Sequence, residues 1–112
     1  MSDYNGYTNR ATWLVSLWMD NNEDVRDYWL DRGRMIYKHK AKGQRHFTKM
    51  EDAAIIFAED IRDSYEEAMS DMMERVDAVS SLWYDMLNDS LLDVDWRQIA
   101  KNLLEDVELE AS

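Results

Sequence analysis

Carboxylates are the side chains of this chain with the most chemical potential, because 24 of its 112 residues are aspartate or glutamate and none is cysteine. Carboxylates that work as a catalytic acid and base need surroundings that separate their pKa values, usually burial among apolar groups. Nearly all of these acids fall on the expected polar sides of helices, which predicts a solvated surface. The pattern therefore does not favour acid–base catalysis.

Metal and nucleophile sites are not indicated either. His39 and His46 lie among lysines and arginines, and the sequence has no zinc-protease, calcium-loop, serine-hydrolase or phosphate-loop motif. Asp93 and Asp95 could hold a divalent ion weakly, but capping of a helix by Asp95 explains their spacing more simply. We expect a protein that is not an enzyme and that binds no cofactor and no metal ion.

The charge of the chain is strongly segregated. The net charge is −11, of which residues 1–31 contribute −4, residues 32–49 contribute +7 and residues 51–112 contribute −14. A charge this large repels itself in a compact fold. Either the hydrophobic core offsets the repulsion, or the charge has a use.

The most regular stretch runs from Thr48 to about Asp77 and predicts one long amphipathic helix. Its apolar positions recur at helical spacing, at Ala54, Ala58, Ile61, Tyr65, Met69, Met72 and Val76. The opposite side carries the predicted acidic face, namely Glu59, Asp60, Asp63, Glu66, Glu67, Asp71, Glu74 and Asp77. These acids span about 27 Å, or one charge per ~3.4 Å, which is the axial phosphate spacing of one DNA strand. A face that only keeps the protein in solution is the other interpretation.

Other elements must surround this helix, and they are also expected to be helical. Proline is absent and glycine occurs only at positions 6, 33 and 43, whereas hairpin-rich chains need many such turn residues. We therefore predict an all-α fold, a single compact bundle of about five helices in one domain, residues 1–112. Its irregular parts are expected to be a lead at 1–7, a basic loop at 38–47, a bend near 78–81 and a frayed tail at 108–112.

Capping residues and apolar spacing place the remaining helices. We expect Thr8 or Asn9 to start the first helix, and Asn21 and Asn22 to separate it from the second. A capping box at Thr48–Glu51 starts the long helix, and a similar box at Asp95 and Gln98 starts the last. The first helix carries a broad apolar side, with Trp13 next to Leu17 and Leu14 next to Trp18. In the second and last helices the expected inward positions are Val25, Tyr28, Trp29, Arg32 and Ile36, and Trp96, Ile99, Ala100, Leu103, Leu104 and Val107. Gly33 predicts either a close approach of another helix or a kink.

Two further surfaces could contact a partner. The first helix has more large apolar side chains than one neighbour can cover, so Trp13 or Trp18 could anchor an interface, including a homodimer. The basic residues Arg34, Lys38, Lys40, Lys42 and Arg45 could bind nucleic acid, or they could pair with the protein's own acids. Because the rest of the chain is so acidic, we expect no direct binding to DNA.

The opening segment YTNRATWLVSLWMDNN, residues 7–22, resembles a motif of small acidic phage and plasmid proteins, N-x-x-T-W-x-V-x-L-W-x-D-N. The closing segment SLLDVDWRQIAKNLL, residues 90–104, resembles the way these proteins end. The resemblance implies an origin in a mobile genetic element and implies no particular activity. In composition the chain is also similar to small acidic phage proteins that imitate DNA and occupy restriction or CRISPR enzymes.

These observations favour an acidic helical inhibitor that occupies a basic, nucleic-acid-binding surface of a host defence protein, an anti-restriction or anti-CRISPR function. The first alternative is a structural or regulatory phage protein that dimerises through aromatic helices. The second is a nucleic-acid binder that acts through residues 32–49. No apolar run approaches the roughly 20 residues that cross a bilayer, and residues 1–10 do not resemble a signal peptide, so we expect no membrane contact and a place in the host cytoplasm.

Overall fold

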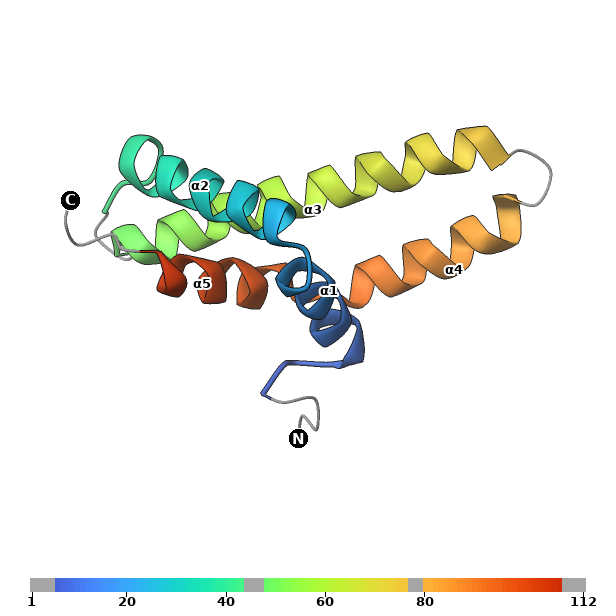
Figure 1. Ribbon diagram of the computed structural model, residues 1–112, viewed down its shortest axis with the longest axis horizontal. Coiled ribbons are helices and arrows are strands. Elements are labelled where there is room, and N and C mark those ends of the chain that lie inside the picture. The colour runs from blue at the N-terminus through green and yellow to red at the C-terminus, as the bar shows by residue number, and fades with distance from the viewer. Residues whose placement is uncertain (1–5, 44–47, 77–79, 108–112) are drawn as a thin grey trace.

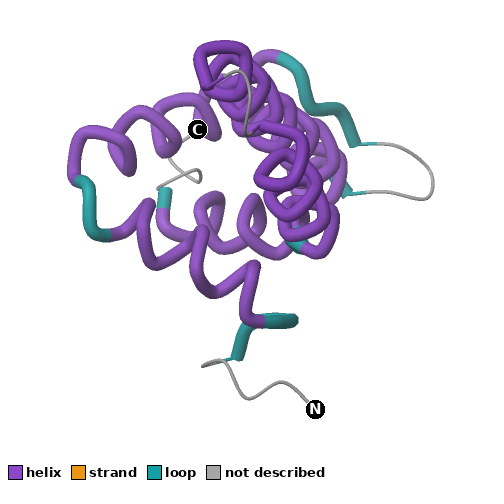
Figure 2. The backbone as a smooth tube through the Cα atoms, turned by 90° about the vertical axis from the view of Figure 1, so that its right-hand side faces the viewer, coloured by secondary structure: helices purple, strands orange, loops and turns teal. Residues whose placement is uncertain are grey.

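The computed structural model describes residues 6–43, 48–76 and 80–107, except for the side chains at 73, 75, 76 and 80–84. Over these residues it contains α-helices and no strand, as Figures 1 and 2 show. The helices are α1 (Arg10–Asp20), α2 (Glu23–His39), α3 (Lys49–Val76), α4 (Ser80–Asp93) and α5 (Trp96–Asp106). The predicted all-α bundle of about five helices is confirmed.

The helix starts follow from capping side chains that the sequence predicts. Asn9 and Asn22 accept hydrogen bonds from the backbone amides of Thr12 and Val25, at 2.9 and 3.1 Å. At the start of α3 the capping box is closed in both directions. The Thr48 amide donates to the Glu51 carboxylate at 2.8 Å, and the Glu51 amide donates to the Thr48 hydroxyl at 3.0 Å. Each cap satisfies an amide that the helix itself leaves free.

The first half of α3 forms the middle of the core, where it packs against α2 and α5. Its buried side chains are Ala53, Ala54, Phe57, Ala58 and Ile61. Phe57 is completely buried and was not part of the predicted apolar stripe. From α5, all six predicted inward residues, Trp96 to Val107, are buried, which confirms that prediction.

Gly33 lies where α2 and α3 approach each other closely. A Cβ atom at this position would lie 2.9 Å from Cε2 of Phe57 and 3.3 Å from Cδ2 of Leu104. Since Phe57 and Leu104 are fully buried, neither can move aside easily. Of the two expectations for Gly33, the close approach is the one that the structure supports.

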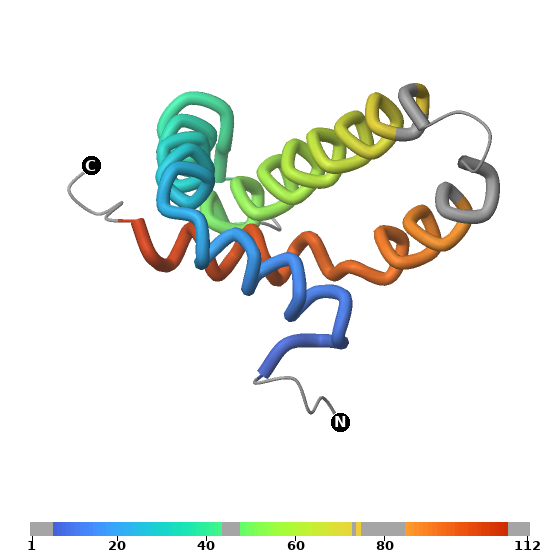
Figure 3. The backbone as a smooth tube through the Cα atoms, turned by 45° about the vertical axis from the view of Figure 1, so that its right-hand side comes forward, coloured from blue at the N-terminus to red at the C-terminus, as the bar shows by residue number. Residues whose placement is uncertain are grey.

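The second half of α3 leaves the core together with α4, and the two helices reach away from the other three (Figures 1 and 3). Tyr65 marks the point of departure, because its ring stacks between Trp29 at 6.4 Å and Trp96 at 5.7 Å, measured between centroids. Met69 is buried, but Met72 is 48% exposed. Met72 therefore does not belong to the core, contrary to the prediction, because no other helix covers the end of this hairpin.

Helix α2 differs from its prediction at two places. Tyr28 is 58% exposed rather than inward, while Leu30, which was not among the expected inward positions, is buried. The helix also continues to His39, so Lys38 belongs to its last turn and the basic loop begins later than expected. The described residues exclude 44–47, 77–79 and 108–112. The predicted tail and the first part of the predicted bend near 78–81 therefore lie outside them, while positions 80 and 81 begin α4.

Candidate functional site

The outer part of the α3–α4 hairpin is strongly acidic. We call residues 66–76 of α3 together with α4 the acidic arm. Its sequence has seven carboxylates and one cation, Arg75, whose side chain is not described. Of these carboxylates, Glu66 is half-buried and the other six are exposed, namely Glu67, Asp71, Glu74, Asp85, Asp89 and Asp93. None of the seven pairs with a cation whose side chain the structure describes.

Only part of the acidic face predicted for α3 lies on this arm. Glu59 is exposed, but Asp60 lies against α2, where it accepts a hydrogen bond from Nε of Arg32 at 2.6 Å. This bond raises the pKa of Arg32, so the guanidinium stays charged at every ordinary pH. Asp63 pairs with its neighbour Arg62 at 3.1 Å. Asp60 therefore does not belong to the solvent-facing row, which corrects the prediction, and Asp77 lies outside the described residues.

The acids of α4 were not part of the predicted face, although the sequence holds a signal for them. Asp85, Asp89 and Asp93 follow one another at intervals of four residues, which places them on one side of a helix. Because α4 packs beside α3, their charges add to those of Glu67, Asp71 and Glu74. Both acidic rows, which are separate in the sequence, therefore lie on the same hairpin.

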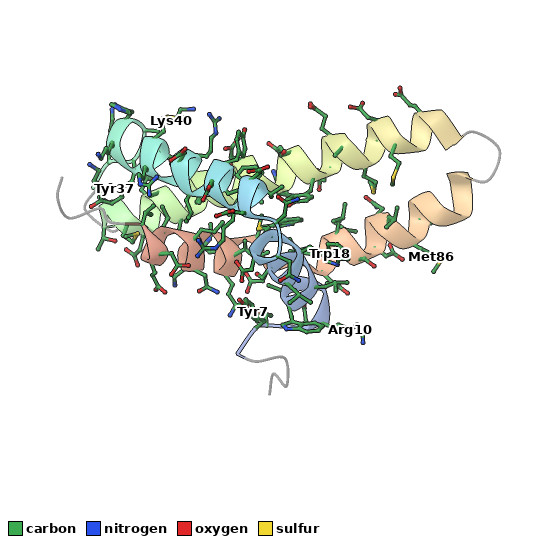
Figure 4. All side chains as sticks on the ribbon, viewed as in Figure 1. Tyr7, Arg10, Trp18, Tyr37, Lys40 and Met86 are labelled. Atoms are coloured by element: carbon green, nitrogen blue, oxygen red, sulfur yellow. The ribbon has the colours of Figure 1, made fainter. Side chains whose placement is uncertain are left out.

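The basic residues lie at the opposite end of the molecule, which measures 50 × 32 × 31 Å. Figure 4 shows Tyr37 and Lys40 at one end and Met86, on the arm, towards the other. Lys38, Lys40 and Lys42 are exposed, whereas Arg34 pairs with Asp31 at 2.5 Å and Arg45 lies outside the described residues. Of the described cations between residues 32 and 49, Arg32 alone reaches an acid of the predicted face. The basic end therefore does not neutralise the arm.

The two tryptophans proposed as interface anchors differ in exposure. Trp18 is 70% exposed and projects from α1 (Figure 4), while Trp13 is half-buried. Leu14 and Leu17, on the same side as Trp18, are exposed as well. The broad apolar side predicted for the first helix is therefore exposed at these three residues.

The opening segment, residues 7–22, and the closing segment, residues 90–104, meet in the fold through a hydrogen-bonded cluster. Thr8 donates its hydroxyl to Asp95 at 2.6 Å, and its amide donates to the Gln98 side chain at 2.8 Å. The hydroxyl of Thr12 accepts from the Asp95 amide at 2.8 Å and donates to Asn9 at 2.7 Å. Gln98 thus binds the N-terminal lead instead of closing a box with Asp95, although Asp95 caps α5 as predicted. These hydrogen bonds hold the two segments together. The polar groups of these residues are therefore already hydrogen-bonded within the protein.

No arrangement suited to catalysis stands out among the described residues. In that part of the chain there is no group of three or more histidine, aspartate or glutamate side chains that could hold a metal ion. One surface hollow of about 140 Å³ lies between α3 and α5, lined by Met50, Ala54, Arg97 and Lys101 among others. It is smaller than the cavities that usually enclose a small-molecule ligand. A hollow of about 360 Å³ is lined only by residues of α5 and its cap, among them Gln98, Asn102 and Glu105. No helix in the described ranges is long and apolar enough to cross a membrane.

Comparison with known proteins gives a family and no activity. No curated protein and no solved structure matches the chain. One family model matches residues 1–111, so that it includes both ends of the hydrogen-bonded cluster and the whole acidic arm. The chain therefore belongs to this family, the family of unknown function DUF7249.

Proposed function

We propose that this protein is a non-enzymatic inhibitor that inserts its acidic arm into a basic, nucleic-acid-binding surface of a host defence protein. The proposal rests on the carboxylates of the arm, none of which pairs with a cation whose side chain the structure describes. The resemblance of residues 7–22 to phage proteins motivates the choice of a restriction or CRISPR effector in the host cytoplasm as the target.

The charge density of the arm suits a surface that binds phosphates. Helix α4 has 14 residues and is therefore about 20 Å long, and α3 runs beside it. Seven carboxylates over about 20 Å amount to one charge per ~3 Å, between the ~3.4 Å of a single DNA strand and the ~1.7 Å of the duplex. A groove of lysines and arginines that tracks phosphates would meet a comparable row of charges on the arm.

The separation of charge also supports an oriented approach. Attractive and repulsive charges at the two ends of a molecule steer its encounter with a charged partner. A basic surface attracts the arm and repels the end that carries Lys38, Lys40 and Lys42. The partner would therefore meet the arm before it meets the other faces of the molecule.

The test is a titration of candidate host nucleases with the protein at low and at high salt. In the arm variant, Glu67→Gln, Asp71→Asn and Glu74→Gln remove three exposed charges without changing the size of the side chains much. The control variant removes three exposed charges elsewhere, through Asp24→Asn, Asp27→Asn and Glu105→Gln, and so has the same net charge. At about 0.5–1 kcal/mol for each charge, the arm variant should bind about tenfold to 100-fold more weakly.

Binding should weaken steeply with salt for the unmodified protein and for the control variant. Equal losses in the two variants would mean that only net charge matters, and binding that ignores salt would remove the electrostatic basis of the proposal. A gel-shift assay separates the other candidate function. If the protein itself retards DNA, and a Lys40→Glu variant does not, the basic end rather than the arm is the functional surface.

A further inference from the structure

Helix α1 buries two small polar side chains and a methionine, and it exposes three larger apolar side chains. Thr12, Ser16 and Met19, which recur at intervals of three and four residues, are buried against the rest of the fold. The reason is chemical, because the Thr12 hydroxyl holds the Asp95 amide at 2.8 Å and Asn9 at 2.7 Å. Once this side is fixed inward, the opposite side of α1 must face solvent.

The exposed side consists of large apolar side chains at helical spacing. Leu14, Leu17 and Trp18 stand at positions i, i+3 and i+4, so they form one contiguous face. They are 39%, 37% and 70% exposed, respectively. Residues 11–19 are also the longest stretch of the sequence without a charged residue. An uncharged apolar face on a protein of net charge −11 is typical of a contact surface.

The two ends of this face carry opposite charges. Arg10 begins α1 and is exposed, and no described carboxylate pairs with it. A cation there meets the positive end of the helix dipole, while the last turn of α1, where a cation is favourable, has none. At that other end Asp20, Glu23 and Asp24 are all exposed, and Arg26 is shared between Asp20 and Asp106. At each end of the face, therefore, some charges have no partner of opposite sign among the described residues.

We propose that this face binds a second copy of the chain, with the two α1 helices antiparallel about a two-fold axis. An antiparallel pair places Arg10 of each copy beside Asp20, Glu23 and Asp24 of the other, twice over. A two-fold axis between Val15 and Ser16 also sets Leu14 of one copy opposite Leu17 of the other. The apolar face and both charged ends are then matched at once, as an isologous contact requires.

The apolar face of α1 with its charged ends is complementary to a second copy of itself, and for this reason we propose a second copy as its partner. A face with a cation at one end and acids at the other pairs with its own antiparallel image and repels a parallel one. The contact is short, since α1 has 11 residues and is about 16 Å long. It falls below the ~800 Å² per partner of a standard interface, so the expected dimer is reversible, with a dissociation constant of about 1–100 μM.

Sedimentation equilibrium over a range of concentrations tests the proposal on the full chain. Trp18→Ala should raise the dimer dissociation constant by about tenfold or more, because an exposed tryptophan at the centre of a contact dominates its affinity. Met86→Ala is the matched control, since Met86 is 52% exposed on α4, away from α1 (Figure 4), and it should leave the dimer unchanged. Circular dichroism checks that the fold of each variant is intact.

A charge exchange tests the antiparallel arrangement. Arg10→Glu should weaken the dimer, and the double variant with Asn21→Lys should recover affinity, because residue 21 of one copy faces residue 10 of the other in this register. Asn21 is exposed and has ordinary helical backbone angles, so it accepts lysine. Failure of the double variant to recover affinity would overturn the arrangement.

A chain that stays monomeric up to about 1 mM would overturn the proposal as a whole and leave the face to a different protein. The proposal does not depend on the function proposed for the arm. The arm variant should leave the dimer intact, and Trp18→Ala should leave salt-dependent binding by the arm intact, so each proposal can fail without the other.

Discussion

Gly33→Ala should destabilise the protein, although alanine is a better helix former than glycine. Alanine in the middle of a helix gains about 1 kcal/mol over glycine. Here the new Cβ would lie 2.9 Å from Cε2 of Phe57 and 3.3 Å from Cδ2 of Leu104, in a core where both side chains are fully buried. Overpacking of this kind costs about 1–3 kcal/mol. We therefore expect the free energy of unfolding to fall by up to about 2 kcal/mol.

Urea unfolding, followed by circular dichroism, measures the effect. The control is Gly43→Ala, because a Cβ there meets nothing closer than the Lys49 amide nitrogen at 3.7 Å, so this variant should be unchanged or more stable by up to about 1 kcal/mol. In a Phe57→Leu background the cost of Gly33→Ala should shrink by about 1 kcal/mol, since the clashing ring is gone. A Gly33→Ala variant that is more stable than the parent protein would refute the close approach of α2 and α3.

Three further variants test local features by the same unfolding assay. Thr12→Val should cost about 2 kcal/mol and Thr12→Ser much less, because only valine loses the hydroxyl bonded to Asn9 and the Asp95 amide. Thr48→Ala should cost about 1 kcal/mol by opening the capping box, and a change below about 0.3 kcal/mol would contradict its role. Burial raises the pKa of Tyr65, so the folded state favours the neutral phenol. The stability gained from this preference is complete below the ordinary tyrosine pKa of about 10 and is lost as the pH rises through the raised pKa of the folded state. Tyr65→Phe should therefore lose less stability between about pH 9 and 11 than the parent protein.

Much of the fold could be predicted because local signals agree with the tertiary structure. Asn9, Asn22 and Asp95 cap helices where the sequence indicates, and Thr48 closes its box with Glu51. These bonds join residues three positions apart, so the sequence alone contains both partners. The apolar spacing of α5 also predicts its buried side correctly, because its inward residues pack into an apolar core.

The side of α1 that faces the core could not be predicted from spacing. Leu14 and Trp18 carry the stronger apolar signal, but the hydrogen bond from the Asp95 amide to Thr12 joins residues 83 positions apart. No local pattern contains such a partner. The prediction that Tyr28 points inward was wrong because Trp29 and Leu30 occupy the side of α2 that meets the core.

The candidate site was predicted in part. Helical spacing finds the acids of α3, but it cannot show that Arg32, 28 positions away from Asp60, removes that carboxylate from the row. It also cannot show that Asp85 and Asp89 lie on a helix next to the acids of α3, because that depends on how α4 packs beside α3. The separation of the basic end from the arm is likewise a property of the fold, since the charges of residues 32–49 and 66–93 could have lain side by side.

Competition with DNA tests the central claim most directly, that the arm takes the place of nucleic acid on a basic surface. A host nuclease that binds the protein is loaded with labelled duplex DNA at low salt, and the protein is added until the DNA is released. We expect the parent protein and the control variant (Asp24→Asn, Asp27→Asn, Glu105→Gln) to release the DNA at similar concentrations. The arm variant (Glu67→Gln, Asp71→Asn, Glu74→Gln) should release it only at a concentration at least about tenfold higher. Release of the DNA by the arm variant at the same concentration as by the parent protein would contradict the claim.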